Sequence, residues 1–96
     1  MLVSDINNNK ENRIKYRSKQ DITAQILTAA KDKPLGKTKL MYSSMVSSSQ
    51  LKEYLSEILD QKLLLYNEGS RMYQTTEEGL EFLRLYEKIK SLGDIH

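Results

Sequence analysis

The sequence contains no cysteine, no tryptophan, one proline and one histidine in 96 residues. Without cysteine the chain can form neither disulfides nor thiolate metal sites. The single histidine is His96, the last residue of the sequence, and it has no second histidine with which to form a metal-binding or catalytic cluster. We therefore expect no metal centre in this protein.

Long apolar runs are absent as well. No stretch approaches the roughly 18 apolar residues that cross a membrane as a helix. Residues 1–10 lack the basic start and the apolar segment of a signal peptide. We expect a soluble cytoplasmic protein with no membrane partner. A chain of 96 residues allows one small domain with a limited core, so a second copy is a natural source of further apolar burial.

Two features resemble nucleotide-binding or catalytic motifs, but each has a simpler explanation. The GKT segment at 36–38 is not the end of a phosphate-binding loop, because Lys31 stands where that loop requires glycine. The carboxylates of Glu77, Glu78 and Glu81 cluster at a predicted helix start, where favourable interaction with the helix dipole explains them. We expect neither a cofactor nor enzymatic activity.

The charges are unevenly distributed, although the net charge is only +2. Most basic residues lie within the first 52 positions, whereas residues 53–96 contain five basic and nine acidic residues. This asymmetry indicates an anionic partner for the first half of the chain. The alternative is a solvated surface on which charges cluster by chance.

The stretch 36–61 has the pattern of a short helix over 37–44, a turn, and a longer helix over 47–61. Ser47 and Gln50 have the spacing of a capping box. Leu51, Leu55 and Ile58 then repeat at helical intervals. The opposite side of this helix carries Ser49, Lys52, Glu53 and Ser56. A helix fixed by a preceding short helix, with polar and basic residues outward, is typical of a helix-turn-helix.

The chain before this stretch predicts an arm and a supporting helix. We expect a flexible basic arm over 1–17, ending in RIKYR, in which basic residues alternate with Ile14 and Tyr16. Such a segment can follow a phosphate backbone or enter a minor groove, although a solubilising tail or a packed strand edge explains it at least as well. Ser18 and Asp21 have capping spacing and predict a helix over 18–31, which Pro34 ends.

The chain after it predicts a β-hairpin and a last helix. Apolar runs at 62–67 and 71–75 flank the turn NEGS, and their apolar residues are expected to cover the open side of the three helices. Thr76 is the expected cap of a helix over 75–92.

This last helix has two apolar stripes, of which Leu80 and Leu83 form the first. The second stripe consists of Phe82, Leu85, Ile89 and Leu92, which have the 3-4-3 spacing of a heptad. Tyr86 lies beside this stripe. One stripe can pack on the core and the other on a partner helix, which predicts a homodimer. The alternative is a single wide face directed to the core.

Three helices, a hairpin and a final helix, in that order, are the elements of a winged helix-turn-helix. The segments GKTKLMYSSMVSSSQLKEYLSEILDQKLLL and YQTTEEGLEFLRLYEKI resemble the small archaeal winged-helix DNA-binding proteins. The matching positions are Lys37, Thr38, the leucines at 63–65, Tyr73, Thr76, Glu77, Gly79, Phe82 and Leu83. The resemblance implies a mainly α fold with a small β-hairpin wing (α+β), DNA binding, a regulatory or chromatin role, and dimerisation through the last helix.

We accordingly expect an arm at 1–17, a winged helix-turn-helix domain at 18–75 and a dimerisation helix at 76–96. The expected function is that of a homodimeric, nucleoid-associated transcriptional regulator, with helix 47–61 in the major groove of double-stranded DNA and hairpin 63–75 as the wing. Two alternatives stay open. One is a winged-helix protein-interaction module, and the other is a chromatin protein without sequence specificity.

Specific contacts follow from this arrangement. Base edges are expected to meet Ser48, Ser49 and Gln50, and glutamine can pair with adenine. The alternative role of the serines is capping and turn formation. Phosphates are expected to bind Lys37, Lys39 and Lys52, which set affinity and register without carrying sequence information.

Two further residues complete the expected DNA contacts. Arg71, beside the hairpin turn, is expected to reach the backbone or the minor groove. Glu53 repels phosphate unless it accepts a hydrogen bond from cytosine or pairs with a neighbouring lysine. The scarcity of arginine on helix 47–61 predicts modest or shape-led recognition.

Overall fold

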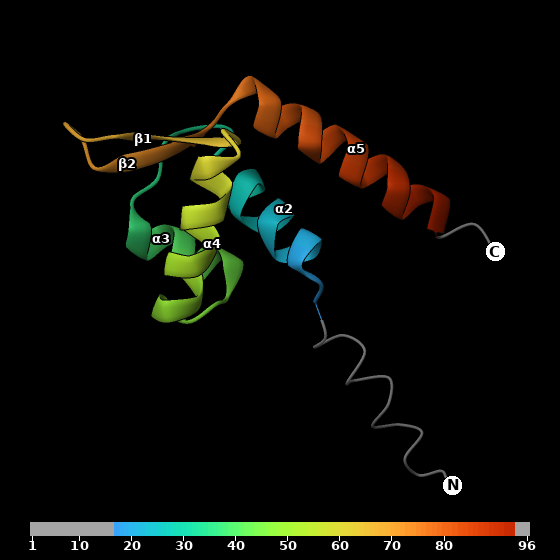
Figure 1. Cartoon of the computed structure of the whole chain (residues 1–96), viewed down its shortest axis with the longest axis horizontal. Helices are drawn as coiled ribbons and strands as arrows, with labels where there is room; N and C mark the ends of the chain where they lie inside the picture. Colours follow the sequence, from blue (N-terminus) through green and yellow to red (C-terminus); the bar gives the residue numbers. More distant parts are fainter. Residues whose placement is uncertain (1–16, 94–96) are drawn as a thin grey trace, which may run out of the picture.

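The computed structural model describes residues 17–93. Three helices come first, α2 (Lys19–Ala29), α3 (Lys37–Ser44) and α4 (Ser48–Asp60). They are followed by the strands β1 (Leu64–Asn67) and β2 (Met72–Thr75) and by helix α5 (Glu77–Gly93) (Figure 1). The predicted order of elements and the mainly helical winged-helix fold are confirmed. Residues 1–16 of the predicted arm, and His96, lie outside the described residues.

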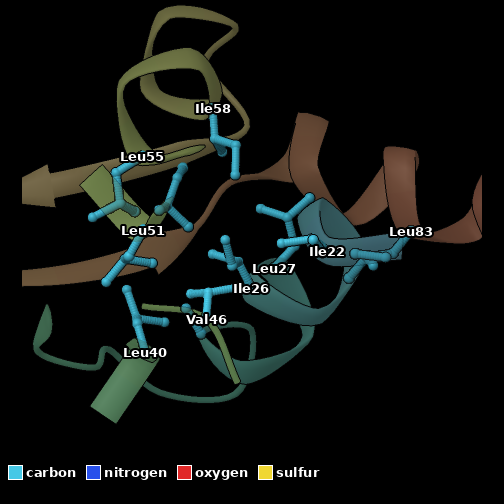
Figure 2. Close-up of a cluster of buried hydrophobic side chains, with 12 residues drawn as sticks. Ile22, Ile26, Leu27, Leu40, Val46, Leu51, Leu55, Ile58 and Leu83 are labelled. Carbon is cyan, nitrogen blue, oxygen red and sulfur yellow. The ribbon is translucent and has the colours of Figure 1, made fainter. Parts of the chain in front are cut away.

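The core is formed where α2, α3 and α4 meet. Its fully buried side chains include Ile26 and Leu27 from α2, Leu40 from α3, and Leu51 and Ile58 from α4 (Figure 2). Leu64 of β1 and Leu83 of α5 extend this cluster. The apolar stripe predicted for helix 47–61 therefore faces the core, which leaves the opposite side of α4 free for solvent or a ligand.

Helix α2 begins as predicted but ends earlier than the predicted range of 18–31. The Ser18 hydroxyl accepts from the Asp21 amide at 3.0 Å, and the Asp21 carboxylate accepts from the Ser18 amide at 2.9 Å. At the other end, Thr75 of β2 donates its hydroxyl to the Leu27 carbonyl at 2.7 Å and its amide to the Ala30 carbonyl at 3.1 Å. The hairpin thus supplies partners for the last carbonyls of the helix, so the chain can turn away after Ala29.

The hairpin is a two-stranded antiparallel sheet with one additional bridge. Leu64 pairs with Thr75 and Tyr66 with Tyr73. Leu35, in the connector before α3, exchanges two backbone hydrogen bonds with Tyr73 at 2.9 and 2.8 Å. This bridge ties the connector to the wing. It was not predicted, because a single extended residue has no periodicity.

Only one face of the hairpin covers the helices. Leu64 is buried, but Leu65 is 64% exposed and Met72 is 40% exposed. The prediction that the apolar residues of the hairpin cover the helices is therefore correct for Leu64 and wrong for Leu65 and Met72. The physical reason is that successive side chains of a strand point to opposite faces.

Helix α5 is joined to the hairpin by a tightly packed corner. The Thr76 hydroxyl accepts from the Gly79 amide at 3.0 Å and donates to the Lys62 carbonyl at 2.8 Å, so the predicted cap is confirmed. A Cβ at Gly79 would lie 2.3 Å from the Leu63 carbonyl oxygen. From this corner α5 packs along α2 and extends away from the hairpin (Figure 1).

Candidate nucleic-acid interface

The turn between α3 and α4 is fixed at both ends, by backbone hydrogen bonds after α3 and by side-chain caps before α4. After α3, Met45 adopts a left-handed conformation with φ 55°, and the Val46 amide donates to the Met41 carbonyl at 3.4 Å. This pairing is the Schellman type of helix end. The capping box predicted for α4 is confirmed, with the Gln50 amide donating to the Ser47 hydroxyl at 3.2 Å and the Ser47 amide to the Gln50 side-chain oxygen at 3.0 Å.

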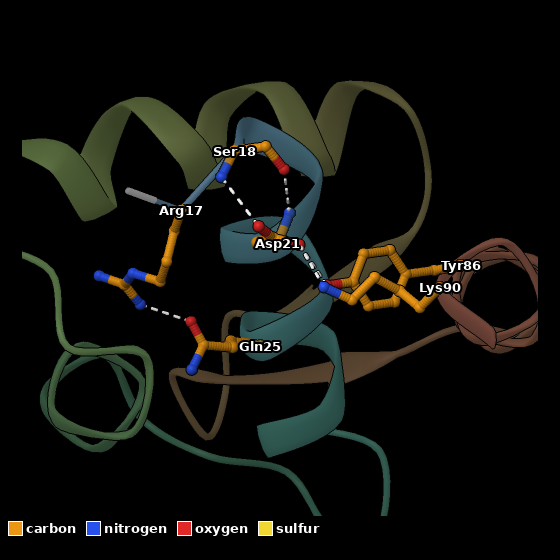
Figure 3. A network of polar contacts seen from close by, with 6 residues as sticks. All are labelled: Arg17, Ser18, Asp21, Gln25, Tyr86 and Lys90. Atoms are coloured by element: carbon orange, nitrogen blue, oxygen red, sulfur yellow. Dashed lines mark hydrogen bonds and ion pairs between the residues drawn. The ribbon is translucent and has the colours of Figure 1, made fainter. Parts of the chain in front are cut away.

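Arg17 holds the same turn from outside. Its guanidinium donates to the carbonyls of Ser44 at 2.6 Å and Met45 at 2.7 Å. It also donates to the Gln25 side chain on α2 (Figure 3). A cation at the carbonyl end of α3 interacts favourably with the helix dipole. The last residue of the predicted arm is therefore bound to the domain, and sequence reasoning missed this role because its partners lie far along the chain.

The outward side of α4 divides into two halves of different charge. Ser48, Ser49, Lys52 and Glu53, near its start, are all exposed as predicted. Glu57 and Asp60, also exposed, make the second half acidic. Glu57 forms an exposed ion pair of 3.1 Å with Lys19. Only the first turns of α4 are therefore suited to approach a polyanion.

Gln50 is exposed at the start of α4, but part of its hydrogen-bonding capacity is used within the protein. Its side-chain oxygen accepts from the Ser47 amide, as described above. Pairing with adenine requires both the oxygen and the amide nitrogen of the glutamine. The predicted bidentate contact from Gln50 would therefore cost α4 one of its two capping bonds.

The start of α3 is open and positively charged. Gly36 precedes the helix, and no side chain caps this end. The amides of the first helical turn have no partner within a helix, and such amides bind phosphate readily. Lys37 and Lys39 are exposed in that turn, as predicted. The structure thus brings two predicted phosphate-binding side chains to a helix end with the matching polarity.

The wing presents one arginine at its tip and an uncharged outer face. Arg71 is exposed in the turn with φ 60°, and its amide donates to the Asn67 carbonyl at 2.7 Å. The rings of Tyr66 and Tyr73 lie 4.7 Å apart on the inner face and stiffen the hairpin. Figure 1 places the hairpin and α3 on the side of the molecule away from the C-terminal end of α5.

A polar network attaches α5 to α2. The Tyr86 hydroxyl donates to the Asp21 carboxylate, and the Lys90 ammonium lies 3.8 Å from the same carboxylate (Figure 3). The bond from Tyr86, with that from the Ser18 amide, lowers the pKa of Asp21. Burial and the bond to Asp21 raise the pKa of Tyr86 to about 12. Asp21 therefore both caps α2 and positions α5.

The predicted dimer residues fall into two groups. Phe82 and Tyr86 are partly buried against the core of their own domain. The other three, Leu85, Ile89 and Leu92, are 52%, 68% and 65% exposed. The second apolar stripe of α5 is thus shared between the core and the surface, and Leu85, Ile89 and Leu92 are largely uncovered within residues 17–93.

Two other features, a metal site and a membrane-spanning helix, can be checked in the residues that the structure describes. Between Arg17 and Gly93 no group of histidine, cysteine or carboxylate side chains is placed to hold a metal ion. No helix in that same range is long and apolar enough to cross a membrane.

A helix-turn-helix with a hairpin wing and an open, basic helix start defines a winged-helix domain of the DNA-binding class. Comparison with known families agrees, because the winged helix-turn-helix family matches residues 16–94. The chain belongs to that family, whose members typically have no enzymatic activity. A search of curated proteins found no match to the chain.

Proposed function

We propose that this protein is a transcriptional regulator that binds double-stranded DNA as a homodimer, with α4 in the major groove and the hairpin as the wing. The observation that carries the proposal is the uncapped start of α3 with Lys37 and Lys39 exposed beside it. This basic surface belongs to the same helix-turn-helix unit that presents the exposed serines of α4. A cytoplasmic, nucleoid-associated location follows from such a function.

Lysine contacts to phosphate supply the affinity in this mode. Lys37 and Lys39 at the start of α3, Lys52 on α4 and Arg71 on the wing are all exposed. Contacts of this kind fix the orientation of the protein on the duplex but carry no sequence information. Sequence discrimination therefore depends on the few side chains at the start of α4.

Helix α4 enters the groove with its N-terminal end. Glu57 and Asp60 on its second half would repel phosphate if the helix lay along the groove with its full length. Ser48 and Ser49 then meet base edges, while Glu53 lies next to Lys52 or accepts a hydrogen bond from cytosine. Because serine bonds to any base and Gln50 is partly used for capping, we expect modest sequence discrimination.

Dimerisation through α5 provides the second half-site. Leu85, Ile89 and Leu92 are exposed at heptad spacing on a helix that extends away from the wing. Large apolar side chains clustered on a surface are typical of protein interaction sites. Phe82 and Tyr86 lie at the inner edge of the proposed interface, where they also contact their own core.

A second candidate function is binding to a basic protein partner. The acidic second half of α4, with Glu57 and Asp60 exposed, favours it. A stoichiometric complex with a protein partner, together with no DNA binding at low salt, would support this function instead of the first.

Selection of bound duplexes from a random pool tests the proposal. Enrichment of a palindrome is the result expected of a dimeric regulator, because a two-fold protein binds two-fold sites. Binding without enrichment would indicate a chromatin protein, and the absence of binding at low salt would contradict DNA binding altogether.

A further inference from the structure

A hollow of about 460 Å³ is lined by the connector that precedes α3, by the first turn of α3 and by Met72 of the wing. The apolar part of its lining comes from Pro34, Leu35 and Met72. Three lysines, Lys33, Lys37 and Lys39, also line the hollow, and all three are exposed. The hollow therefore combines an apolar floor with several positive charges.

The positive charge of this hollow is not compensated by the protein. Within residues 17–93 none of the three lysines forms an ion pair. The only carboxylate in the sequence from 31 to 52 is that of Asp32, which is not among the residues that line the hollow. A cleft lined by charges of one sign raises the local concentration of ions of the opposite sign.

The apolar floor is held in place without a ligand. The two backbone hydrogen bonds between Leu35 and Tyr73, at 2.9 and 2.8 Å, fix the connector against the wing. Met72 lies on the outer face of β2 and is 40% exposed. A phosphate group of DNA can use the lysines, but it has no apolar body to cover Pro34 and Met72.

We propose that the hollow binds a small organic anion with a compact apolar body, such as an aromatic carboxylate. The carboxylate interacts with the lysines, and the ring covers Met72 and Pro34. The bound anion competes with DNA for Lys37 and Lys39. This competition rests on the proposed function, whereas binding of the anion is independent of it. For a ligand of this size we expect a dissociation constant on the order of a millimolar.

Titration with 2-naphthoate, followed by NMR of backbone amides and methionine methyls, tests this proposal. Saturable shifts are expected for the amides of 36–39 and for the Met72 methyl. The neutral 2-naphthalenemethanol lacks the charge and inorganic phosphate lacks the ring, so each is expected to give much smaller effects at the same concentration.

Variants separate the two halves of the site. Replacing Lys37 and Lys39 together by glutamine is expected to weaken 2-naphthoate binding about tenfold. Each exposed ion pair contributes about two- to fivefold to the affinity, and the double variant removes two of them. Met72→Gln retains the length of the side chain and is expected to weaken 2-naphthoate binding without changing the response to phosphate. Lys88→Gln, an exposed substitution on α5, is the matched control and is expected to change neither.

Three results would overturn the ligand site: no saturable shift, shifts confined to other surfaces, or an equal response to phosphate. A parallel titration with duplex DNA distinguishes failure of the site from failure of the proposed function. If 2-naphthoate binds and duplex does not, the proposed function fails alone. If duplex binds and 2-naphthoate does not, the ligand site fails alone. If both bind but 2-naphthoate does not weaken duplex binding, the competition is refuted.

Discussion

At the scale of single residues, the clearest constraint is the absence of a side chain at Gly79. The backbone carbonyl of Leu63 and the methyl of Thr75 would lie 2.3 and 2.6 Å from a Cβ at this position. Neither neighbour can move easily, since one is backbone and the other belongs to a buried threonine. The glycine therefore permits the close approach of α5 to the backbone just before β1 and to the end of β2.

Gly79→Ala is expected to lower the free energy of unfolding by about 1–3 kcal/mol, the usual cost of overpacking. Urea denaturation followed by circular dichroism measures the change. Gly93→Ala is the control on the same helix, because a Cβ there meets no atom within 4 Å. Equal stability of the two variants would contradict the packing described for the corner.

A second residue-scale prediction concerns Asp21. Its folded pKa is lowered chiefly by the bond from Tyr86, so the ionised carboxylate stabilises the fold above the unfolded pKa of about 3.9. That stabilisation is lost as the pH falls through the folded pKa. The stability difference between wild type and Asp21→Asn is therefore expected to be largest near neutral pH and to shrink below about pH 4. Urea unfolding at a series of pH values measures it, and a difference independent of pH would refute the network.

Tyr86 provides the complementary test at high pH. Its folded pKa is raised to about 12, above the unfolded value of about 10. The stabilisation from the protonated hydroxyl is thus fully present below about pH 10 and is lost as the pH rises through the folded value. Tyr86→Phe is expected to remove this alkaline dependence while retaining the ring packing, which the same unfolding series can measure.

At the scale of elements, the helix-turn-helix depends on contacts from outside its own sequence. Arg17 neutralises the carbonyl end of α3 through Ser44 and Met45. Arg17→Ala is expected to destabilise the protein by about 1–3 kcal/mol, because hydrogen bonds from a charged donor are strong and the bond to the Ser44 carbonyl is partly buried. Hydrogen exchange should show faster opening of α3 and of the start of α4.

Lys19→Ala is the matched control for Arg17, since its ion pair with Glu57 is exposed and such pairs contribute little. An Arg17→Ala variant no less stable than Lys19→Ala would contradict the structural role of Arg17.

The sequence predicts those elements whose determinants are local. The capping pairs Ser18–Asp21 and Ser47–Gln50 place two helix starts correctly, because both partners lie within four residues of each other. The Leu35 bridge and the contacts of Arg17 with Ser44 and Met45 depend on residues 27 or more positions away, and no local pattern encodes them. The left-handed Met45 and Lys62 were also not predicted, since glycine usually occupies such positions.

At the scale of the whole molecule, the exposed apolar part of α5 carries the prediction of a dimer. Ile89→Lys places a charge in the centre of the Leu85–Leu92 surface and is expected to convert a dimer into a monomer in sedimentation experiments. Because Ile89 is 68% exposed, the substitution leaves the core intact. A wild-type protein that is already monomeric would refute the proposed interface.

The distribution of charge over the molecule carries the prediction of DNA binding. The basic side chains expected to meet phosphate lie on the helix-turn-helix and the wing, whereas the second half of α4 carries Glu57 and Asp60, and α5 carries four acidic and three basic residues. The start of α3, the start of α4 and the wing can therefore approach a duplex while the second half of α4 is repelled from it, which orients the protein on DNA.

The salt dependence of duplex binding tests this orientation, because it reports the number of phosphates that the protein contacts. Each contact contributes about 0.9 to the slope of log affinity against log salt. Lys39→Ala and Lys52→Ala are each expected to reduce the slope by about one unit, whereas Lys88→Ala on α5 is expected to leave it unchanged. Equal slopes for all three variants, or no binding of duplex at low salt, would contradict DNA binding through this surface.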